Sequence, residues 1–256
     1  MRKQISIAIL FFFIPFLGHS QNELFLHRTF VNQGDTLFYR VMFPINYDQK
    51  KSYPLIIFLH GSGERGSDNE QQLKHGSAFF ANDSIRKRYP AIVIFPQCPL
   101  TKGWVDFNYS KGGKFIFKVG KEPTQPLRLV NLLVKKYKLT KTVDTRRIYV
   151  MGLSLGGMGT FDLICRYPKT YAAAIPICGA VDMNRLKKCY KMPIRIYHGS
   201  DDNAVSTEYS RNAFKTLKDK GSKQVEYIEF SGVGHDSWNH VFANANFLSW
   251  LFSKKK

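Results

Sequence analysis

The fold is decided by the stretch Ile148-Tyr149-Val150-Met151-Gly152-Leu153-Ser154-Leu155-Gly156-Gly157-Met158-Gly159. An apolar, β-branched run leads into a turn of small residues and then into an apolar helical pattern, which predicts a strand, a sharp turn and a helix. The turn has the spacing Gly-x-Ser-x-Gly, because side chains at Gly152 or Gly156 would collide with the neighbouring strand or helix. Ser154 is then held in a strained conformation with its hydroxyl exposed, which makes it the candidate nucleophile.

The predicted helix begins directly after Ser154. Its N-terminus directs the amide of Leu155 toward the place where negative charge would develop on an attacked carbonyl group, so Leu155 is a candidate for an oxyanion hole. A glycine-rich connection without chemistry is the alternative, since five-residue patterns occur by chance. The remaining motifs decide between the two.

Residues 1–20 have the layout of a secretory signal peptide. Met1-Arg2-Lys3 precedes an apolar run over residues 5–17, and the small residues Gly18 and Ser20 precede the expected cut. An apolar run of about 13 residues is too short to span a bilayer comfortably, which disfavours a membrane anchor. We therefore expect a periplasmic or secreted protein that begins near Gln21 and has no membrane span after cleavage.

Composition predicts one globular domain over residues 21–256. The chain has 256 residues, of which 44% are hydrophobic and 14% aromatic. The formal net charge is +19, but the lysines are spread along the chain without a motif that reads nucleic acid, so we expect no nucleic-acid partner. An affinity for anionic polysaccharide or for an anionic envelope is one interpretation of this charge, and solvated lysines without a partner are the other.

The four cysteines are Cys98, Cys165, Cys178 and Cys189. Export permits disulfides, and four thiols allow three pairings. Cys178 and Cys189 are nearest in sequence, so they are the first pair to test. Four buried free thiols are the alternative.

Apolar runs alternate with helical periods along the chain, which predicts a mostly parallel central sheet flanked by helices. Strands are expected at residues 23–31, 36–43, 54–59, 91–95, 147–151, 171–177, 194–197 and 225–230, the first two as a hairpin. Helices are expected at residues 70–80, 124–137, 155–166, 206–220 and 236–252. Only about 15 residues separate the strands at 171–177 and 194–197, which leaves no room there for a large cap domain.

A glycine-rich loop, His60-Gly61-Ser62-Gly63-Glu64-Arg65-Gly66, follows the strand at 54–59. Backbone N–H groups can approach a ligand where side chains are absent. In a serine hydrolase this loop supplies the second oxyanion donor, and we expect the amide of Ser62, with Gly63 as the adjacent candidate at the substrate. A tight turn that binds nothing is the alternative.

A long irregular stretch runs from Pro96 to about Glu122 and carries several aromatic residues: Trp104, Phe107, Tyr109, Phe115 and Phe117. Loops of this length are usually functional or disordered. The aromatic side chains line a substrate cleft in one interpretation and pin the loop down in the other. Trp104 is the residue that we expect to contact the substrate.

Two further turns lie where parallel sheets place catalytic groups, at the carboxyl ends of strands. One contains Asp201 and Asp202, and the other contains His235 between glycine and Asp236. A serine nucleophile needs an imidazole base, which in turn needs a carboxylate, and in this topology they follow in the order Ser, acid, His. His235 is the expected base because His240 falls inside a helical pattern. Asp202 is favoured as the acid over Asp201, and Asp182 is a more distant alternative.

Five motifs, taken together in order, resemble the secreted α/β-hydrolases. They are His-Gly-Ser-Gly-Glu-Arg-Gly at 60–66, Pro-Gln-Cys-Pro at 96–99, Gly-Leu-Ser-Leu-Gly-Gly at 152–157, His-Gly-Ser-Asp-Asp-x-x-Val at 198–205 and Gly-His-Asp-Ser-Trp at 234–238. The chain from about Pro54 onward is similar to the branch that groups feruloyl and acetyl-xylan esterases with polyhydroxybutyrate-depolymerase-like, dienelactone-hydrolase-like and prolyl-oligopeptidase-like proteins.

The resemblance implies Ser154 as nucleophile and His235 as base. It also selects Asp202, because the family's acid stands three residues before the valine, here Val205. Glu64 and Arg65 match the family as well, and we expect them to brace the oxyanion loop as an ion pair. Serine in place of cysteine at the nucleophile position disfavours a narrow dienelactone-hydrolase function.

The implied function is that of a serine carboxylic ester hydrolase that works through an acyl-enzyme without a cofactor or metal. Its substrates would be esters attached to polysaccharide, of feruloyl or acetyl type. The alternatives are a prolyl-oligopeptidase-like serine peptidase and a non-catalytic protein that binds glycan or envelope material. A metal site built from His198, Asp201, His235 and Asp236 lacks a tight ligand spacing. The sequence predicts no oligomeric state.

Overall fold

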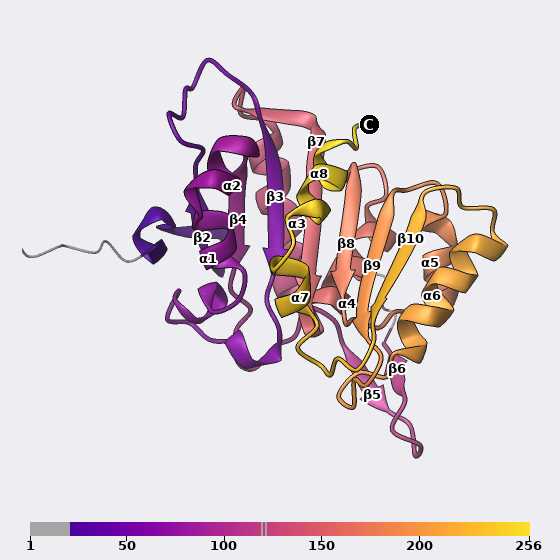
Figure 1. Cartoon of the computed structure of the whole chain (residues 1–256). Helices are drawn as coiled ribbons and strands as arrows, with labels where there is room; N and C mark the ends of the chain where they lie inside the picture. The colour runs from indigo at the N-terminus through magenta and orange to yellow at the C-terminus, as the bar shows by residue number, and fades with distance from the viewer. Residues whose placement is uncertain (1–20, 119, 121) are drawn as a thin grey trace, which may run out of the picture.

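The computed structural model describes residues 21–118, 120 and 122–256. The expected signal peptide, residues 1–20, lies outside the described residues. An eight-stranded sheet runs through the molecule in the order β1-β2-β4-β3-β7-β8-β9-β10, with helices on both faces (Figure 1). Its strands are β1 (Leu26–Asn32), β2 (Asp35–Met42), β3 (Tyr53–Leu59), β4 (Ile92–Pro96), β7 (Val143–Leu153), β8 (Ala173–Ile177), β9 (Ile194–Gly199) and β10 (Val225–Phe230).

The sheet is parallel from β4 to β10, whereas β1 and β2 run antiparallel at one edge. All residues of β3 and β4 are buried, as expected for strands covered on both faces. The predicted hairpin at the N-terminal edge is confirmed, and its turn places Gln33 and Gly34 at φ angles of 50° and 84°. The mostly parallel sheet of the α/β-hydrolase fold is therefore present as predicted.

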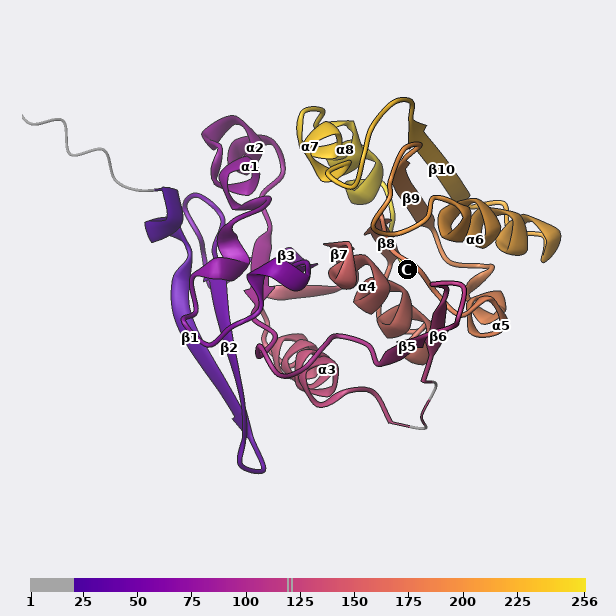
Figure 2. The same cartoon turned by 90° about the horizontal axis from the view of Figure 1, so that it is seen from below.

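Two layers of helices cover the sheet (Figure 2). One face carries α3 (Gln125–Lys138), α4 (Leu155–Arg166), α5 (Met183–Leu186) and α6 (Glu208–Asp219). The other face carries α1 (Ser77–Ala81), α2 (Asp83–Arg88), α7 (Trp238–Phe242) and α8 (Asn246–Phe252). Short 3₁₀ turns lie at η1 (Gln21–Leu24), η2 (Ser62–Glu64), η3 (Gln71–Leu73) and η4 (Lys187–Cys189).

The sheet separates two hydrophobic cores. Alternate residues of β3 point to opposite faces, so Ile57 packs on the α3 and α4 side and Phe58 on the α7 and α8 side. Burial on both faces fixes the register of the central strands, because a slip of one residue would exchange the two sets of side chains. The carboxyl ends of β7, β9 and β10 are thereby held in fixed positions.

Three segments differ from the prediction. The expected helix at 70–80 is divided into η3 and α1, because Gly76 lies between them at a φ of 85°. The expected helix at 236–252 is divided into α7 and α8, and the side chain of Asn244 accepts the N–H of Asn246 where the second part begins. The stretch at 96–122 contains a separate antiparallel hairpin of β5 (Phe107–Tyr109) and β6 (Phe115–Phe117).

All four cysteines are free thiols. The neighbour of Cys189 is Cys165, with 3.8 Å between their sulfur atoms, and not Cys178 as the sequence spacing indicated. Cys178 lies instead at the end of β8, where its N–H donates to the carbonyl oxygen of Tyr197. The fold brings Cys165 to Cys189 because the end of α4 packs against η4.

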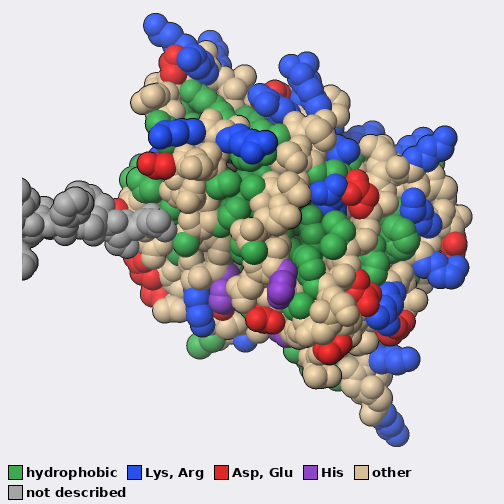
Figure 3. All heavy atoms as spheres, in the orientation of Figure 1, with side chains coloured by type: hydrophobic (Ala, Val, Ile, Leu, Met, Phe, Trp, Pro, Cys, Tyr) green, Lys and Arg blue, Asp and Glu red, His purple; other side chains and the backbone are tan. Residues whose placement is uncertain are grey.

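Basic side chains are dispersed over the face shown in Figure 3, between apolar and uncharged groups. This view fits the scattered lysines of the sequence and shows no basic stripe over the elements that it displays. None of the helices formed by the described residues has the length and apolar composition needed to cross a bilayer.

Candidate active site

Ser154 occupies the turn between β7 and α4. Its φ of 53° is the strained, left-handed value expected for a serine at this kind of turn. A side-chain carbon at Gly152 would lie 2.5 Å from the carbonyl oxygen of Gly156 and 2.6 Å from that of Leu59, so the turn requires glycine there. The N–H of Ser154 donates to the carbonyl oxygen of Ile177 at 2.9 Å and ties the turn to β8.

The structure brings Ser154, His235 and Asp202 together from three separate turns. Nε2 of His235 lies 2.9 Å from Oγ of Ser154, and Nδ1 of His235 lies 2.7 Å from Oδ2 of Asp202. These turns follow β7, β9 and β10, whose carboxyl ends share one edge of the sheet. A continuous chain of hydrogen bonds therefore joins a hydroxyl, an imidazole and a carboxylate.

The hydrogen bonds also define the tautomer of His235. An ionised carboxylate can only accept, so Nδ1 of His235 carries the hydrogen that Asp202 accepts. Nε2 is then left with its lone pair toward the Ser154 hydroxyl, which donates to it. This is the arrangement that a general base needs before it takes the proton of the hydroxyl.

The surroundings of Asp202 keep its carboxyl group ionised. Burial by itself would raise the pKa of this carboxyl, but hydrogen bonds from His198, His235 and the N–H of Val205 hold it well below its ordinary value. Oδ1 accepts the N–H groups of Ala204 and Val205 at 2.9 and 2.8 Å. Asp202 therefore keeps a negative charge beside His235 at neutral pH.

The alternative acids lie elsewhere. Asp201 is exposed and accepts the hydroxyl of Ser200 at 2.6 Å. Asp182 caps α5 by accepting the N–H of Arg185 at 3.0 Å. Among the three carboxylates considered from the sequence, Asp202 is the one that His235 contacts.

The loop after β3 lies beside the nucleophile turn. A side-chain carbon at Gly61 would come within 3.7 Å of Cβ of Ser154, and Ser62 lines the same cavity as Ser154. Buried His60 fixes this loop, because its Nε2 accepts the N–H of Cys98 at 2.9 Å and its Nδ1 donates to the carbonyl oxygen of Gly61 at 2.6 Å. Burial lowers the pKa of His60 to about 4, so the ring makes these contacts in its neutral form.

The expected ion pair between Glu64 and Arg65 is not formed. Buried Glu64 turns inward and lies 3.5 Å from Nε2 of His75. Arg65 turns the other way and donates to the carbonyl oxygens of Ser62, Leu100 and Lys102. Both residues brace the loop, but toward different neighbours, because Glu64 ends the tight turn η2 and Arg65 follows it in an extended conformation.

A cavity of about 740 Å³ opens above Ser154. The hairpin β5–β6 contributes one wall of it with Phe107, Tyr109 and Phe115, and Arg65 and Lys102 also line the cavity. The sequence placed these three rings among several aromatic candidates but did not single them out. Their shared position in a β5–β6 pair, with alternating apolar residues, was the available signal.

Trp104, the expected substrate contact, is fully buried beneath the loops. Its indole N–H donates to the carbonyl oxygen of His60 at 3.0 Å, so it supports the glycine-rich loop at residues 60–66. Gly63 is exposed but is not among the residues that line the cavity. The cavity above Ser154 is therefore lined by rings of the hairpin, whereas neither Trp104 nor Gly63 is among its lining residues.

Tyr209 of α6 anchors the aromatic hairpin. Its hydroxyl oxygen accepts the N–H of Phe115 at 2.7 Å, and the two ring centroids are 5.4 Å apart. Within the hairpin, the rings of Phe107 and Phe115 meet edge to face at 4.8 Å. The wall is thus held against the body of the protein although Tyr109 is 64% exposed.

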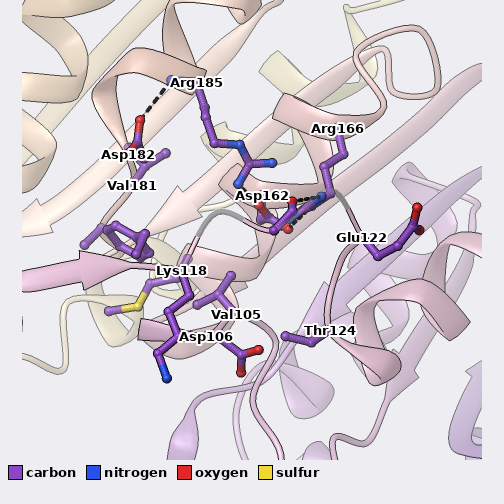
Figure 4. A pocket seen from close by; sticks show the side chains of 14 residues that line it. Val105, Asp106, Lys118, Glu122, Thr124, Asp162, Arg166, Val181, Asp182 and Arg185 are labelled. Carbon is purple, nitrogen blue, oxygen red and sulfur yellow. Dashed lines mark hydrogen bonds and ion pairs between the residues drawn. The ribbon is translucent and has the colours of Figure 1, made fainter. Parts of the chain in front are cut away.

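A second cavity of about 180 Å³ adjoins the first (Figure 4). Val105, Asp106, Thr124 and Met158 line both. On its far side Asp162 points between Arg166 and Arg185 and accepts hydrogen bonds from both. Asp162 therefore pairs with two of the cationic side chains that line this cavity.

Metal-ligand atoms within 4.8 Å of one another come from Cys178, Asp202 and His235 in the described part of the chain. His198, Asp201 and Asp236, which the sequence offered as further ligands, are not in this group. Asp202 and His235 already hydrogen-bond each other, and burial raises the pKa of the Cys178 thiol to about 12. Asp202 and His235 lie close together because both belong to the hydrogen-bonded chain that leads to Ser154.

A model of the phospholipase/carboxylesterase family matches residues 42–251. The chain belongs to this family. As a member of the phospholipase/carboxylesterase family it is a serine hydrolase of the esterase type, with the α/β-hydrolase fold that the motifs implied.

The chain is similar to other esterases. Carboxylesterase SOBER1 of Arabidopsis thaliana is 25% identical to it, and the match covers 72% of this chain and 84% of the relative. The bifunctional acetylxylan esterase/xylanase XynS20E of Neocallimastix patriciarum is 25% identical over 65% of this chain and 22% of that protein. A solved thermostable esterase is 33% identical with a TM-score of 0.83, covering 92% of this chain and 64% of that one. The chain thus spans less than two thirds of that structure.

Proposed function

We propose that this chain is an exported serine carboxylic ester hydrolase that acts through an acyl-enzyme on esters attached to polysaccharide. Ser154 is the nucleophile, His235 the general base and acid, and Asp202 the carboxylate that orients His235. The observation that carries the proposal is the hydrogen-bonded chain from Ser154 through His235 to Asp202 at the floor of an open cavity.

The reaction has two steps. His235 takes the hydroxyl proton of Ser154 as Oγ attacks the ester carbonyl carbon, and the tetrahedral intermediate collapses when His235 protonates the leaving alkoxide. Water then attacks the acyl-enzyme, with His235 again as base, and Ser154 recovers its proton. The charge of Asp202 stabilises the imidazolium form of His235 in both steps.

The oxyanion is stabilised by the amides of Leu155 and Ser62. Leu155 is the first residue of α4, so the helix does not use its N–H, which is available to the reacting group. Ser62 opens η2 beside Ser154 and lines the same cavity. Donors fixed before the reaction begins stabilise developing charge without reorganisation.

Three features support a polysaccharide ester as substrate. The aromatic wall of Phe107, Tyr109 and Phe115 offers flat faces on which a sugar ring or an aromatic acyl group stacks. Arg65 and Lys102 at the same cavity, with the overall charge of +19, favour an anionic chain. An acetylxylan esterase occurs among the relatives. Export rests on the signal-peptide pattern of residues 1–20.

The test is an ester panel with the chain from Gln21 onward and its Ser154→Ala variant. We expect turnover of nitrophenyl acetate and of acetylated xylan or methyl ferulate, and a loss of at least about 10³-fold in kcat for Ser154→Ala. Ser206→Ala, at an exposed serine outside the cavity, is the matched control and should retain full activity. Binding of xylan without any turnover would instead indicate a non-catalytic glycan-binding protein.

The substrate class has a separate test in Tyr109→Ala. Loss of one stacked ring should raise KM for methyl ferulate or acetylated xylan about fivefold, while the values for vinyl acetate stay unchanged. Leu139→Ala serves as control because Leu139 is an apolar side chain that is 87% exposed and does not line the cavity. Equal KM values for wild type and Tyr109→Ala on every substrate would show that the ring of Tyr109 on the hairpin does not contribute to substrate binding.

A further inference from the structure

His198 is a fully buried histidine at the end of β9, two residues before the turn that carries Asp201 and Asp202. It belongs to the motif at 198–205, yet the acyl-transfer steps above do not use it. Its side chain and that of Asp202 are both 0% exposed. A buried ionisable ring beside a buried carboxylate needs a physical explanation, because burial of such groups is costly unless they are paired.

The contacts of His198 define its orientation. Nε2 lies 2.9 Å from the carbonyl oxygen of Val205, which can only accept, so Nε2 carries a hydrogen. The same nitrogen lies 3.1 Å from Oδ2 of Asp202, and the hydrogen is shared between the two oxygens. Nδ1 lies 2.7 Å from Oγ of Ser210 in α6, whose hydroxyl donates to it. The ring is therefore held at both nitrogens.

Asp202 consequently has donors on each of its oxygens. Oδ1 is fixed by the amides of Ala204 and Val205. Oδ2 is shared by His235 and His198 at 2.7 and 3.1 Å. Of these two rings, His235 is the one that changes charge during the proposed reaction, and its side chain is 29% exposed. His198 is buried and does not take part in the proton transfer, so it supplies the constant contact.

We propose that His198 is a positioning residue for the acid: it holds Oδ2 of Asp202 in the direction of His235 Nδ1 throughout the catalytic cycle. The proposal rests on the proposed function, because it assigns His198 a role in the same triad. Without His198, the backbone donors still hold Oδ1, but the carboxylate can turn about its Cβ–Cγ bond when His235 moves or changes charge. The carbonyl oxygen of Val205 would also lose the donor that the ring supplies.

The position of Asp202 matters for the rate and not for substrate binding. A carboxylate turned away from Nδ1 no longer holds the reactive tautomer of His235. The substrate cavity includes Ala204, Val205 and His235 but neither His198 nor Asp202. Loss of the positioning contact should therefore lower kcat and leave KM unchanged, which a general loosening of the cavity would not do.

The test compares His198→Met with His198→Gln. Methionine fills the buried space without a donor, whereas the glutamine amide can place an N–H near the position of Nε2. With nitrophenyl acetate, we expect His198→Met to lower kcat at least about tenfold, short of the roughly 10⁴-fold loss that follows removal of the carboxylate charge. KM should stay within about twofold, and His198→Gln should recover most of kcat.

Thr207→Val is the matched control. Thr207 is buried in the same region and its hydroxyl donates to the carbonyl oxygen of Gly199 at 2.6 Å, but it does not contact Asp202. It should lower the melting temperature without lowering kcat. If His198→Met does not fold, His198→Asn replaces it, since the shorter amide cannot reach Asp202 and should show the same loss relative to His198→Gln.

Three results would overturn the proposal: kcat of folded His198→Met within twofold of wild type, a loss that appears in KM, or an equal fall in kcat for Thr207→Val. Wild-type protein and Ser154→Ala are measured in parallel. Absence of wild-type turnover, or full turnover by Ser154→Ala, would refute the proposed function itself and is thereby distinguished from failure of the role of His198.

Discussion

Oδ2 of Asp202 lies 2.7 Å from Nδ1 of His235, although 33 residues separate them along the chain. The neighbouring Asp201 is exposed and accepts the Ser200 hydroxyl instead. The turn after β9 therefore assigns two adjacent carboxylates to different surroundings, one buried against the imidazole and the other in solvent.

Asp202→Asn should lower kcat by roughly 10⁴-fold, because an amide no longer stabilises the imidazolium and favours the wrong tautomer of His235. Asp201→Asn is the matched control and should stay within about twofold of wild type, as expected for an exposed surface substitution. Steady-state kinetics with nitrophenyl acetate measure both. A loss from Asp201→Asn equal to that from Asp202→Asn would show that the acid is assigned to the wrong residue.

The oxyanion role proposed for Ser62 belongs to its backbone N–H and can be tested separately from its side chain. Gly61 is extended, with φ −77° and ψ −174°, which is a conformation that the residue before a proline adopts, and Ser62 is the first residue of η2. Ser62→Pro should therefore fit the backbone while removing the amide N–H together with the hydroxyl. We expect kcat to fall about 10²–10³-fold, the usual loss for one oxyanion donor.

Ser62→Ala keeps the N–H and should retain activity within about threefold, since only the hydroxyl is lost. Kinetics on a small ester compare the two variants, and circular dichroism checks that both are folded. Equal activities of Ser62→Pro and Ser62→Ala would place the second donor on another residue of the loop.

Much of this site follows from local sequence patterns. The turn at Ser154, the alternation of strands and helices along the chain and the positions of Asp202 and His235 after strands depend on glycine spacing and on where apolar runs end. Neighbouring residues determine these features. Glu64 and Arg65 show the limit of that reasoning. Their opposite charges suggested an ion pair. Instead, Glu64 contacts His75, and Arg65 donates to a carbonyl oxygen at Leu100. Neither partner is adjacent in sequence.

Trp104 and His198 also show that local sequence patterns do not determine which distant residues a side chain contacts. The sequence identifies a tryptophan in a loop but not the direction of its ring, and packing under His60 decides that it is buried. His198 stood in a known motif, yet its contact with Asp202 depends on how α6 brings Ser210 to the other ring nitrogen. Tertiary packing sets both outcomes.

The pH dependence of stability should report on His60. Burial lowers its pKa from 6.5 to about 4, so between these values the unfolded chain binds a proton that the folded protein does not. The free energy of unfolding therefore falls as the pH decreases from about 6.5 to about 4. At about 1.4 kcal/mol per pH unit, the lowering of the His60 pKa from 6.5 to about 4 corresponds to about 3.5 kcal/mol.

Urea unfolding at a series of pH values measures this slope. His60→Gln should flatten it, because glutamine does not titrate, while His240→Gln at an exposed position should leave it unchanged. A slope in His60→Gln that matches wild type would show that His60 takes up its proton as easily in the folded protein as in the unfolded chain.

Cys165 and Cys189 should form a disulfide under oxidising conditions, because their sulfur atoms are 3.8 Å apart in the free-thiol form. Exchange with oxidised glutathione would transfer two electrons to glutathione and lower the intact mass by about 2 Da. Cys98 and Cys178 are buried, and burial raises both their pKa values to about 12, so they should stay reduced.

Intact mass and non-reducing peptide maps locate the bond. Cys189→Ser should abolish the mass change, and Cys98→Ser should leave it in place. A bond between Cys178 and Cys189 would contradict the packing of α4 against η4.

The central claim is that the geometry around Ser154 makes it a reactive nucleophile, and active-site labelling measures this most directly. After incubation with a fluorophosphonate, intact mass and peptide mapping should show one phosphonyl group per chain, attached to Ser154, and none in Ser154→Ala or after prior heat denaturation. A folded protein that remains unlabelled, or that is labelled equally in Ser154→Ala, would contradict the account.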